Sequence, residues 1–167
     1  MFRRWLPTTL FALALALPGA SSAAPRLNGP VEARVVEVVD GDTLAVRVTV
    51  WLDQEVVTRV RLEGIDTPES RSTCATEKAM ARAAKDKLAG LVREAMVDQG
   101  KGTITLYNVV YDKYGGRVRA QVRLADGTDV SEALIRAGAA RAYNGGKRQP
   151  WCGVADAGGG GARDEEG

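Results

Sequence analysis

The sequence predicts a mainly β fold of the α+β class, with short strands and two helices in one domain. Five short segments have the composition of strands, and three of them, 44–50, 56–62 and 117–124, alternate between apolar and polar residues with the two-residue period of half-buried strands. A further segment, 76–97, carries apolar residues every three or four positions, as one face of a helix does, and a shorter helix is expected over 130–137. The 167 residues are enough to enclose a single core.

The two ends of the chain differ in composition from the middle. Arg3 and Arg4 precede an apolar run at 6–17, and small residues follow at 21–23. We therefore expect a signal peptide at 1–23 and a secreted or periplasmic mature protein. An uncleaved anchor is the alternative, although the run is shorter than the roughly 20 residues of a membrane span. The predicted domain is 24–153, followed by a flexible Gly-rich acidic tail at 154–167.

Composition excludes several kinds of chemistry. The chain has no histidine, so histidine cannot serve as base, nucleophile or zinc ligand. The net charge of +2 permits a nucleic-acid partner without requiring one. The two cysteines, Cys74 and Cys152, are too few for a zinc site. In an exported protein we expect them to form a disulfide, with two free thiols as the alternative.

Two valine-rich strands are predicted at the start of the domain, over 31–39 and 44–50. The Asp-Gly pair between them is a strong hairpin signal, and Leu44, Val46, Val48 and Val50 share one face of the second strand. The turn needs only one aspartate and the glycine. Asp42 is an extra carboxylate, and it is either an ordinary solvated turn residue or an oxygen ligand.

A third predicted strand, 56–62, leads directly into a charged loop. Its alternation places Arg61 on the polar face, just before Asp66, Thr67 and Glu69. Pro68 biases the residue before it away from helix, which makes this loop extended. One cation and two carboxylates on a braced loop suit a site for phosphate and metal. The alternative is a charged turn without function.

The remaining segments predict a helix, two strands and a second helix. A long helix is expected over 76–97, strands over 103–110 and 117–124, and a short helix over 130–137 with Asp129 as its cap. Ala133, Leu134 and Ile135 are the expected core contacts of the short helix. Three strands, a helix, two strands and a helix fit a five-stranded Greek-key barrel of the OB type.

In such a barrel the first hairpin, the charged loop and the last hairpin are expected to meet at one mouth. There they would offer oxygen ligands for calcium, forked donors for phosphate, a proton acceptor and rings that stack on bases. The oxygen ligands would be Asp42 and Asp66, and the forked donors Arg61 and Arg117. The proton acceptor would be Glu69, and the stacking rings Tyr114 and Tyr143.

Three motifs in this order resemble the staphylococcal nuclease family. They are Asp-Gly-Asp-Thr at 40–43, Arg-Leu-x-Gly-Ile-Asp-Thr-Pro-Glu at 61–69, and Asp-Lys-Tyr-Gly-Gly-Arg at 112–117. The resemblance covers about residues 31–143, and the three motifs together are far more specific than any one alone. It implies a calcium-dependent phosphodiesterase that acts on DNA and RNA, and we expect a monomer.

The resemblance also implies a role for each matching residue. The matches to the calcium ligands are Asp42, Asp66 and the Thr67 backbone carbonyl. The matches to the catalytic groups are Arg61 and Arg117 on the scissile phosphate, and Glu69 as proposed general base. The matches to positions near the nucleotide are Lys113, Tyr114 and, in a less similar sequence context, Tyr143.

Two features depart from the family pattern. The last hairpin has two glycines, 115 and 116, where the type member has one. Matching Arg117 to the catalytic arginine keeps the following strand in phase, whereas an ungapped alignment puts Gly116 there. After the second helix the chain enters a basic loop ending at Trp151 and Cys152, where the type member continues into a further helix.

Two other classes of function remain open from the sequence. One is a non-catalytic OB domain that binds nucleic acid or protein. The other is a calcium-stabilised structural domain, which would need the carboxylates but not the two arginines.

Overall fold

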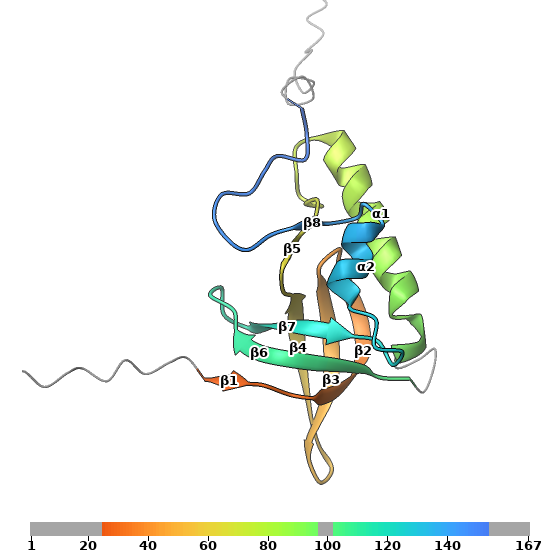
Figure 1. Cartoon of the computed structure of the whole chain (residues 1–167), viewed down its shortest axis with the longest axis vertical. Coiled ribbons are helices and arrows are strands. Elements are labelled where there is room, and N and C mark those ends of the chain that lie inside the picture. The colour runs from red at the N-terminus through yellow and green to blue at the C-terminus, as the bar shows by residue number, and fades with distance from the viewer. Residues whose placement is uncertain (1–24, 97–101, 154–167) are drawn as a thin grey trace, which may run out of the picture.

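The computed structural model describes residues 25–96 and 102–153, and within them it confirms the predicted barrel (Figure 1). The barrel strands are β2 (Val31–Asp40), β3 (Thr43–Trp51), β4 (Gln54–Leu62), β7 (Arg117–Arg123) and β6 (Ile104–Tyr111), hydrogen-bonded in this circular order. A parallel β4–β7 pair and an antiparallel β6–β7 pair close it. A short strand, β1 (Arg26–Leu27), adds to β6. The fold is therefore a closed mixed barrel of OB type with two helices.

The predicted signal peptide at 1–23 and the predicted tail at 154–167 lie outside the residues that the structure describes. The domain boundaries therefore stay predictions. In the described ranges, no helix is both long enough and apolar enough to cross a membrane.

The two helices cover one side of the barrel and lie side by side (Figure 1). Helix α1 spans Ala75–Leu91 and α2 spans Val130–Arg136. The prediction of one continuous helix over 76–97 is wrong. The α-helix stops at Leu91, and a 3-10 turn, η1 (Arg93–Ala95), follows and directs Val92 and Ala95 into the core. Residue 97 lies outside the described ranges.

The core fills the barrel and continues beneath the helices. Its largest fully buried side chains come from every barrel strand and from both helices, as a half-buried alternation and a helical stripe require. They include Leu44, Val46, Val60, Leu62, Leu88, Ile104, Leu106, Val122 and Leu134.

Two apolar residues are exposed against expectation: Val50, which shares a strand face with the buried Leu44, Val46 and Val48, and Ile135, an expected core contact of the short helix. Val50 is 56% exposed because β2 pairs with β3 only as far as Arg47, so the outer half of the β3–β4 hairpin projects beyond the barrel (Figure 1). Ile135 is 36% exposed because α2 buries Val130 and Leu134, which are four residues apart on one face.

The segment after α2 returns across the barrel mouth. Strand β8 (Arg141–Ala142) pairs antiparallel with β5 (Ile65–Asp66), and the Tyr143 backbone N–H donates to the Gly64 carbonyl at 2.8 Å. Residues 143–152, which we call the strap, then run to the N-terminus of α1. There the predicted disulfide between Cys74 and Cys152 is present. The strap is therefore fastened at both ends.

Candidate functional site

An open cleft of about 1270 Å³ lies between the charged loop, the β6–β7 hairpin and the strap. The three segments expected to meet at one mouth all contribute to it. Of the residues predicted to contact metal, phosphate or nucleotide, all line this cleft except Asp66, which is buried against the cleft residue Arg148.

Asp42 sits at the base of the cleft and is only 3% exposed. Strand register explains its main partner, because β3 and β4 place Thr43 opposite Arg61. Arg61 Nη1 lies 2.6 Å from Asp42 Oδ2, and Thr43 Oγ1 donates to Asp42 Oδ1 at 2.8 Å. The first hairpin thus places a buried carboxylate directly beside an arginine.

The electrostatics of Asp42 favour a nearby cation. Burial, opposed by the attraction of Arg61 and supported by neighbouring Asp40, raises the pKa of Asp42 to about 7. A bare carboxylate is therefore costly at this position. A second positive charge would stabilise its ionised form.

Close packing brings the Asp42 turn against the charged loop. A Cβ atom on Gly41 would lie 2.9 Å from the Ala84 Cβ and 3.3 Å from the Thr67 Cβ. Only glycine permits this approach of the turn to both Thr67 and α1. The contact joins two segments that the sequence separates by more than twenty residues.

Asp66 is the second buried carboxylate, at 4% exposure. Trp151 Nε1 donates to its Oδ2 at 3.0 Å, and Arg148 Nε forms an ion pair with its Oδ1. Arg148 also donates from Nη2 to the Thr67 carbonyl at 2.8 Å and pairs with Glu69. Both partners of Asp66 come from the strap.

Sequence reasoning missed Arg148 and Trp151, because it assigned no role to the basic loop after α2. A usable signal was present. The expected disulfide at Cys152 ties this loop to Cys74, only a few residues after Glu69. Partial burial disfavours a charged Arg148, but hydrogen bonds to Glu69 and Asp66 outweigh it and raise the pKa of Arg148 above its ordinary value.

In the β6–β7 hairpin, Arg117 forms an ion pair with a carboxylate of the same hairpin. Arg117 Nε bonds to Oδ2 of Asp112, a buried residue that sequence reasoning did not single out. The Arg117 guanidinium lies 5.3 Å from the Tyr114 ring centroid, and Lys113 Nζ lies 4.8 Å from it. The ring and both cations belong to the same wall of the cleft.

The paired glycines are accommodated within the turn. Gly115 and Gly116 both have left-handed φ angles, of 65° and 64°. Strand β7 begins at Arg117, and the Arg117 side chain lines the cleft. This placement agrees with the alignment that matches Arg117, rather than Gly116, to the family's arginine.

Tyr143 lies on the opposite wall, at the start of the strap. Its hydroxyl donates to the Gly146 carbonyl at 2.7 Å, which folds the strap back on itself. The ring therefore borders the cleft from a fixed backbone position.

Residues 59–151 match the family described as staphylococcal nuclease homologue. The chain belongs to the staphylococcal nuclease homologue family. Relatives from Escherichia coli and Escherichia coli O157:H7, both named "Uncharacterized endonuclease", are each 33% identical over 141 residues. That alignment covers 84% of this chain and 74% of each relative.

The donor chemistry of this staphylococcal nuclease homologue suits a hard cation. Asp42 and Asp66 are buried carboxylates, each already paired with an arginine, and the Thr67 carbonyl accepts from Arg148. Such oxygen donors are the kind that calcium prefers. Within 25–96 and 102–153, however, no group of three or more acidic, histidine or cysteine side chains is arranged to hold a metal. An ion here would depend on two carboxylates, a main-chain carbonyl and water.

Proposed function

We propose that this protein is a calcium-dependent nuclease that hydrolyses phosphodiester bonds of DNA and RNA by attack of water on phosphorus. Membership of the staphylococcal nuclease homologue family and the endonuclease names of the Escherichia coli relatives support a nuclease. The observation that carries the finer proposal is the meeting of Arg61, Arg117, Glu69 and the buried Asp42 in one cleft.

Arg61 and Arg117 are proposed to bind the scissile phosphate and to stabilise the negative charge that grows in the transition state. Each is held by one buried carboxylate, Asp42 or Asp112. A guanidinium has five N–H donors, so these ion pairs leave donors for a phosphate. Because the arginines are fixed before substrate arrives, they lose little reorganisation energy during the reaction.

Asp42, Asp66 and the Thr67 carbonyl are the residues that would hold calcium. When bound, calcium would act as a Lewis acid on the phosphate and as a template for its orientation. Glu69, which lines the cleft with an exposed side chain, is proposed to accept the proton of the attacking water. No histidine is needed for this chemistry.

The nucleotide next to the scissile bond is proposed to contact Lys113, Tyr114 and Tyr143. Lys113 offers a charge to a neighbouring phosphate, and the tyrosine rings offer surfaces for base stacking. Tyr114 is well suited because the residue is 70% exposed and lines the cleft.

We further propose that the protein acts as a monomer outside the cytoplasm, secreted or periplasmic. The disulfide between Cys74 and Cys152 supports this location, because disulfides persist in oxidising compartments. The signal-like residues 1–23 support the same conclusion from the sequence.

The test is hydrolysis of single-stranded DNA and RNA by the mature protein, with calcium and then with excess chelator. The proposal requires cleavage that depends on calcium and is lost in Asp42→Ala. Absence of cleavage by a folded protein in calcium would favour a non-catalytic binding module. Calcium that raises only thermal stability, with no cleavage, would favour a structural calcium domain.

A further inference from the structure

The strap brings a cation onto the proposed metal ligands. A single guanidinium, that of Arg148, contacts Asp66, Glu69 and the Thr67 carbonyl. These are two of the three groups proposed to hold calcium and the carboxylate proposed as the base. No other described side chain is recorded in contact with all three groups.

We propose that Arg148 is a built-in counter-cation, which occupies these ligands in the metal-free protein and must leave them when calcium binds. The inference rests on the proposed calcium dependence. Asp66 is 4% exposed, and without metal its ionised carboxylate needs a positive partner. Calcium and the guanidinium would repel each other at contact distance in this partly buried site, so joint occupancy is disfavoured.

The strap keeps Arg148 at high local concentration. Strand β8 fixes its beginning, and the disulfide fixes Cys152, four residues beyond Arg148. Between them, Trp151 anchors the strap by its bond to Asp66, and the Arg141 guanidinium lies 3.7 Å from the Trp151 ring centroid. A side chain held this way meets its ligands with little further entropy loss.

The two possible roles of Arg148, competitor or support, predict opposite changes in calcium affinity when its side chain is removed. If Arg148 only oriented Asp66 and Glu69 for calcium, its removal would weaken calcium binding. If Arg148 competes with calcium, its removal tightens calcium binding. The sign of this change therefore decides between the two roles without any measurement of cleavage.

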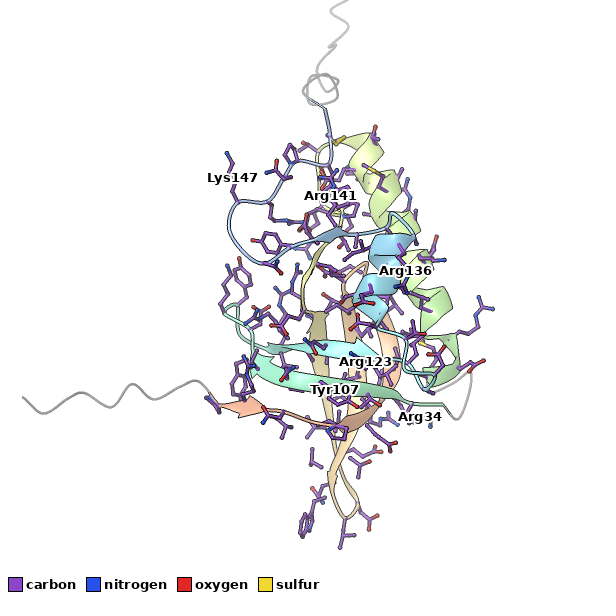
Figure 2. The ribbon with its side chains drawn as sticks, in the orientation of Figure 1. Arg34, Tyr107, Arg123, Arg136, Arg141 and Lys147 are labelled. Atoms are coloured by element: carbon purple, nitrogen blue, oxygen red, sulfur yellow. A yellow bond between two sulfur atoms is a disulfide. The ribbon has the colours of Figure 1, made fainter. Side chains whose placement is uncertain are left out.

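The experiment is calorimetric titration of calcium alone into chelator-treated mature protein, without nucleic acid. Arg148→Gln keeps much of the side chain but removes the charge. Lys147→Gln is the matched control, since it removes the same charge from the adjacent residue. Figure 2 shows Lys147 directed outward from the strap, away from the barrel. We expect Arg148→Gln to bind calcium about tenfold more tightly, a size typical of hydrogen bonds to charged groups, and Lys147→Gln to stay within about twofold of wild type.

Removal of the disulfide provides a second, independent test of the competition. In Cys152→Ser under reducing conditions the strap is released at one end, so Arg148 competes less effectively. We expect calcium to bind this variant more tightly than wild type, and the further gain from Arg148→Gln to shrink to about twofold. Emission from Trp151, which contacts Asp66, gives another binding signal in the variants that retain the disulfide.

Calcium binding by Arg148→Gln that is no tighter than that by Lys147→Gln would overturn the inference. If wild type still cleaves only with calcium, the proposed function stands despite that failure. If no variant binds calcium, both the inference and the calcium part of the proposed function are wrong. Thermal unfolding checks that Arg148→Gln is folded. Arg148→Lys keeps the positive charge but loses the forked guanidinium. Its calcium affinity should therefore lie between those of wild type and Arg148→Gln.

Discussion

Arg61 and Asp42 form an ion pair of 2.6 Å at the base of the cleft, because Asp42 directly precedes Thr43, the residue that pairs with Arg61 across β3 and β4. The pair joins a proposed phosphate ligand to a proposed metal ligand. Removal of either residue leaves the other without its ion-pair partner. A substitution at one position therefore also alters the electrostatic environment of the other.

Arg61→Ala should reduce DNA cleavage by at least about 100-fold, as loss of one preorganised charge donor commonly does. Calcium binding and the fold should stay nearly intact, because Arg61 is proposed to act on the phosphate and not to hold the metal. The measurements are kcat/KM on single-stranded DNA and a calcium titration at pH 7 and pH 9. Arg59→Ala, an exposed arginine two residues earlier on β4, is the matched control. Normal cleavage by Arg61→Ala would rule out its proposed role.

Asp42 should make the metal-free protein less stable as pH rises from about 4 to about 7. Its folded pKa of about 7 lies above the ordinary aspartate pKa of 3.8, so the folded state retains the proton over this interval while the unfolded state releases it. The stabilising contribution is complete below about pH 4 and is lost through about pH 7. Urea unfolding in excess chelator measures this slope. Asp42→Asn should flatten it, and an unchanged slope in that variant would assign the effect to other groups.

Asp112→Asn should impair Arg117 without removing it. The buried carboxylate fixes Arg117 Nε, so the neutral amide leaves the guanidinium less well oriented. We expect kcat to fall about tenfold with little change in KM, as for a group that matters mainly in the transition state. Asp53→Asn at the tip of the β3–β4 hairpin is the control, because asparagine also tolerates its left-handed φ. An equal fall in both variants would show a nonspecific effect of lost charge.

Cys152→Ser should destabilise the fold by up to about 4 kcal/mol, the chain-entropy value for a long closed loop. The bridge joins residues 78 positions apart and holds the strap against the N-terminus of α1. Urea unfolding of oxidised wild type and the variant measures the difference. Equal midpoints would mean that β8 and the Trp151 contact hold the strap without the disulfide.

The barrel was predictable because its signals are local. Alternation along β3, β4 and β7 and the Asp-Gly turn define strands and a hairpin from neighbouring residues alone. The predictions were wrong where packing between segments distant in the sequence decides which residues are buried and where a helix ends. The outer half of the β3–β4 hairpin has the same alternation as the inner half, yet β2 does not extend far enough to cover it. The helix over 76–97 is interrupted at Leu91 because Val92 and Ala95 reach the core through a 3-10 turn.

The sequence by itself determined which chemical groups its motifs carry: the carboxylates at 42, 66 and 69, the arginines at 61 and 117, and the cysteine pair. Their motifs are short, so their residue types and spacing are visible along the chain. Only the tertiary structure decided what each group touches. Asp112 holds Arg117 across a turn, and Arg148 reaches Asp66 across 82 positions. Ion pairs depend on distance in space, which strand register, helix docking and the disulfide fix together.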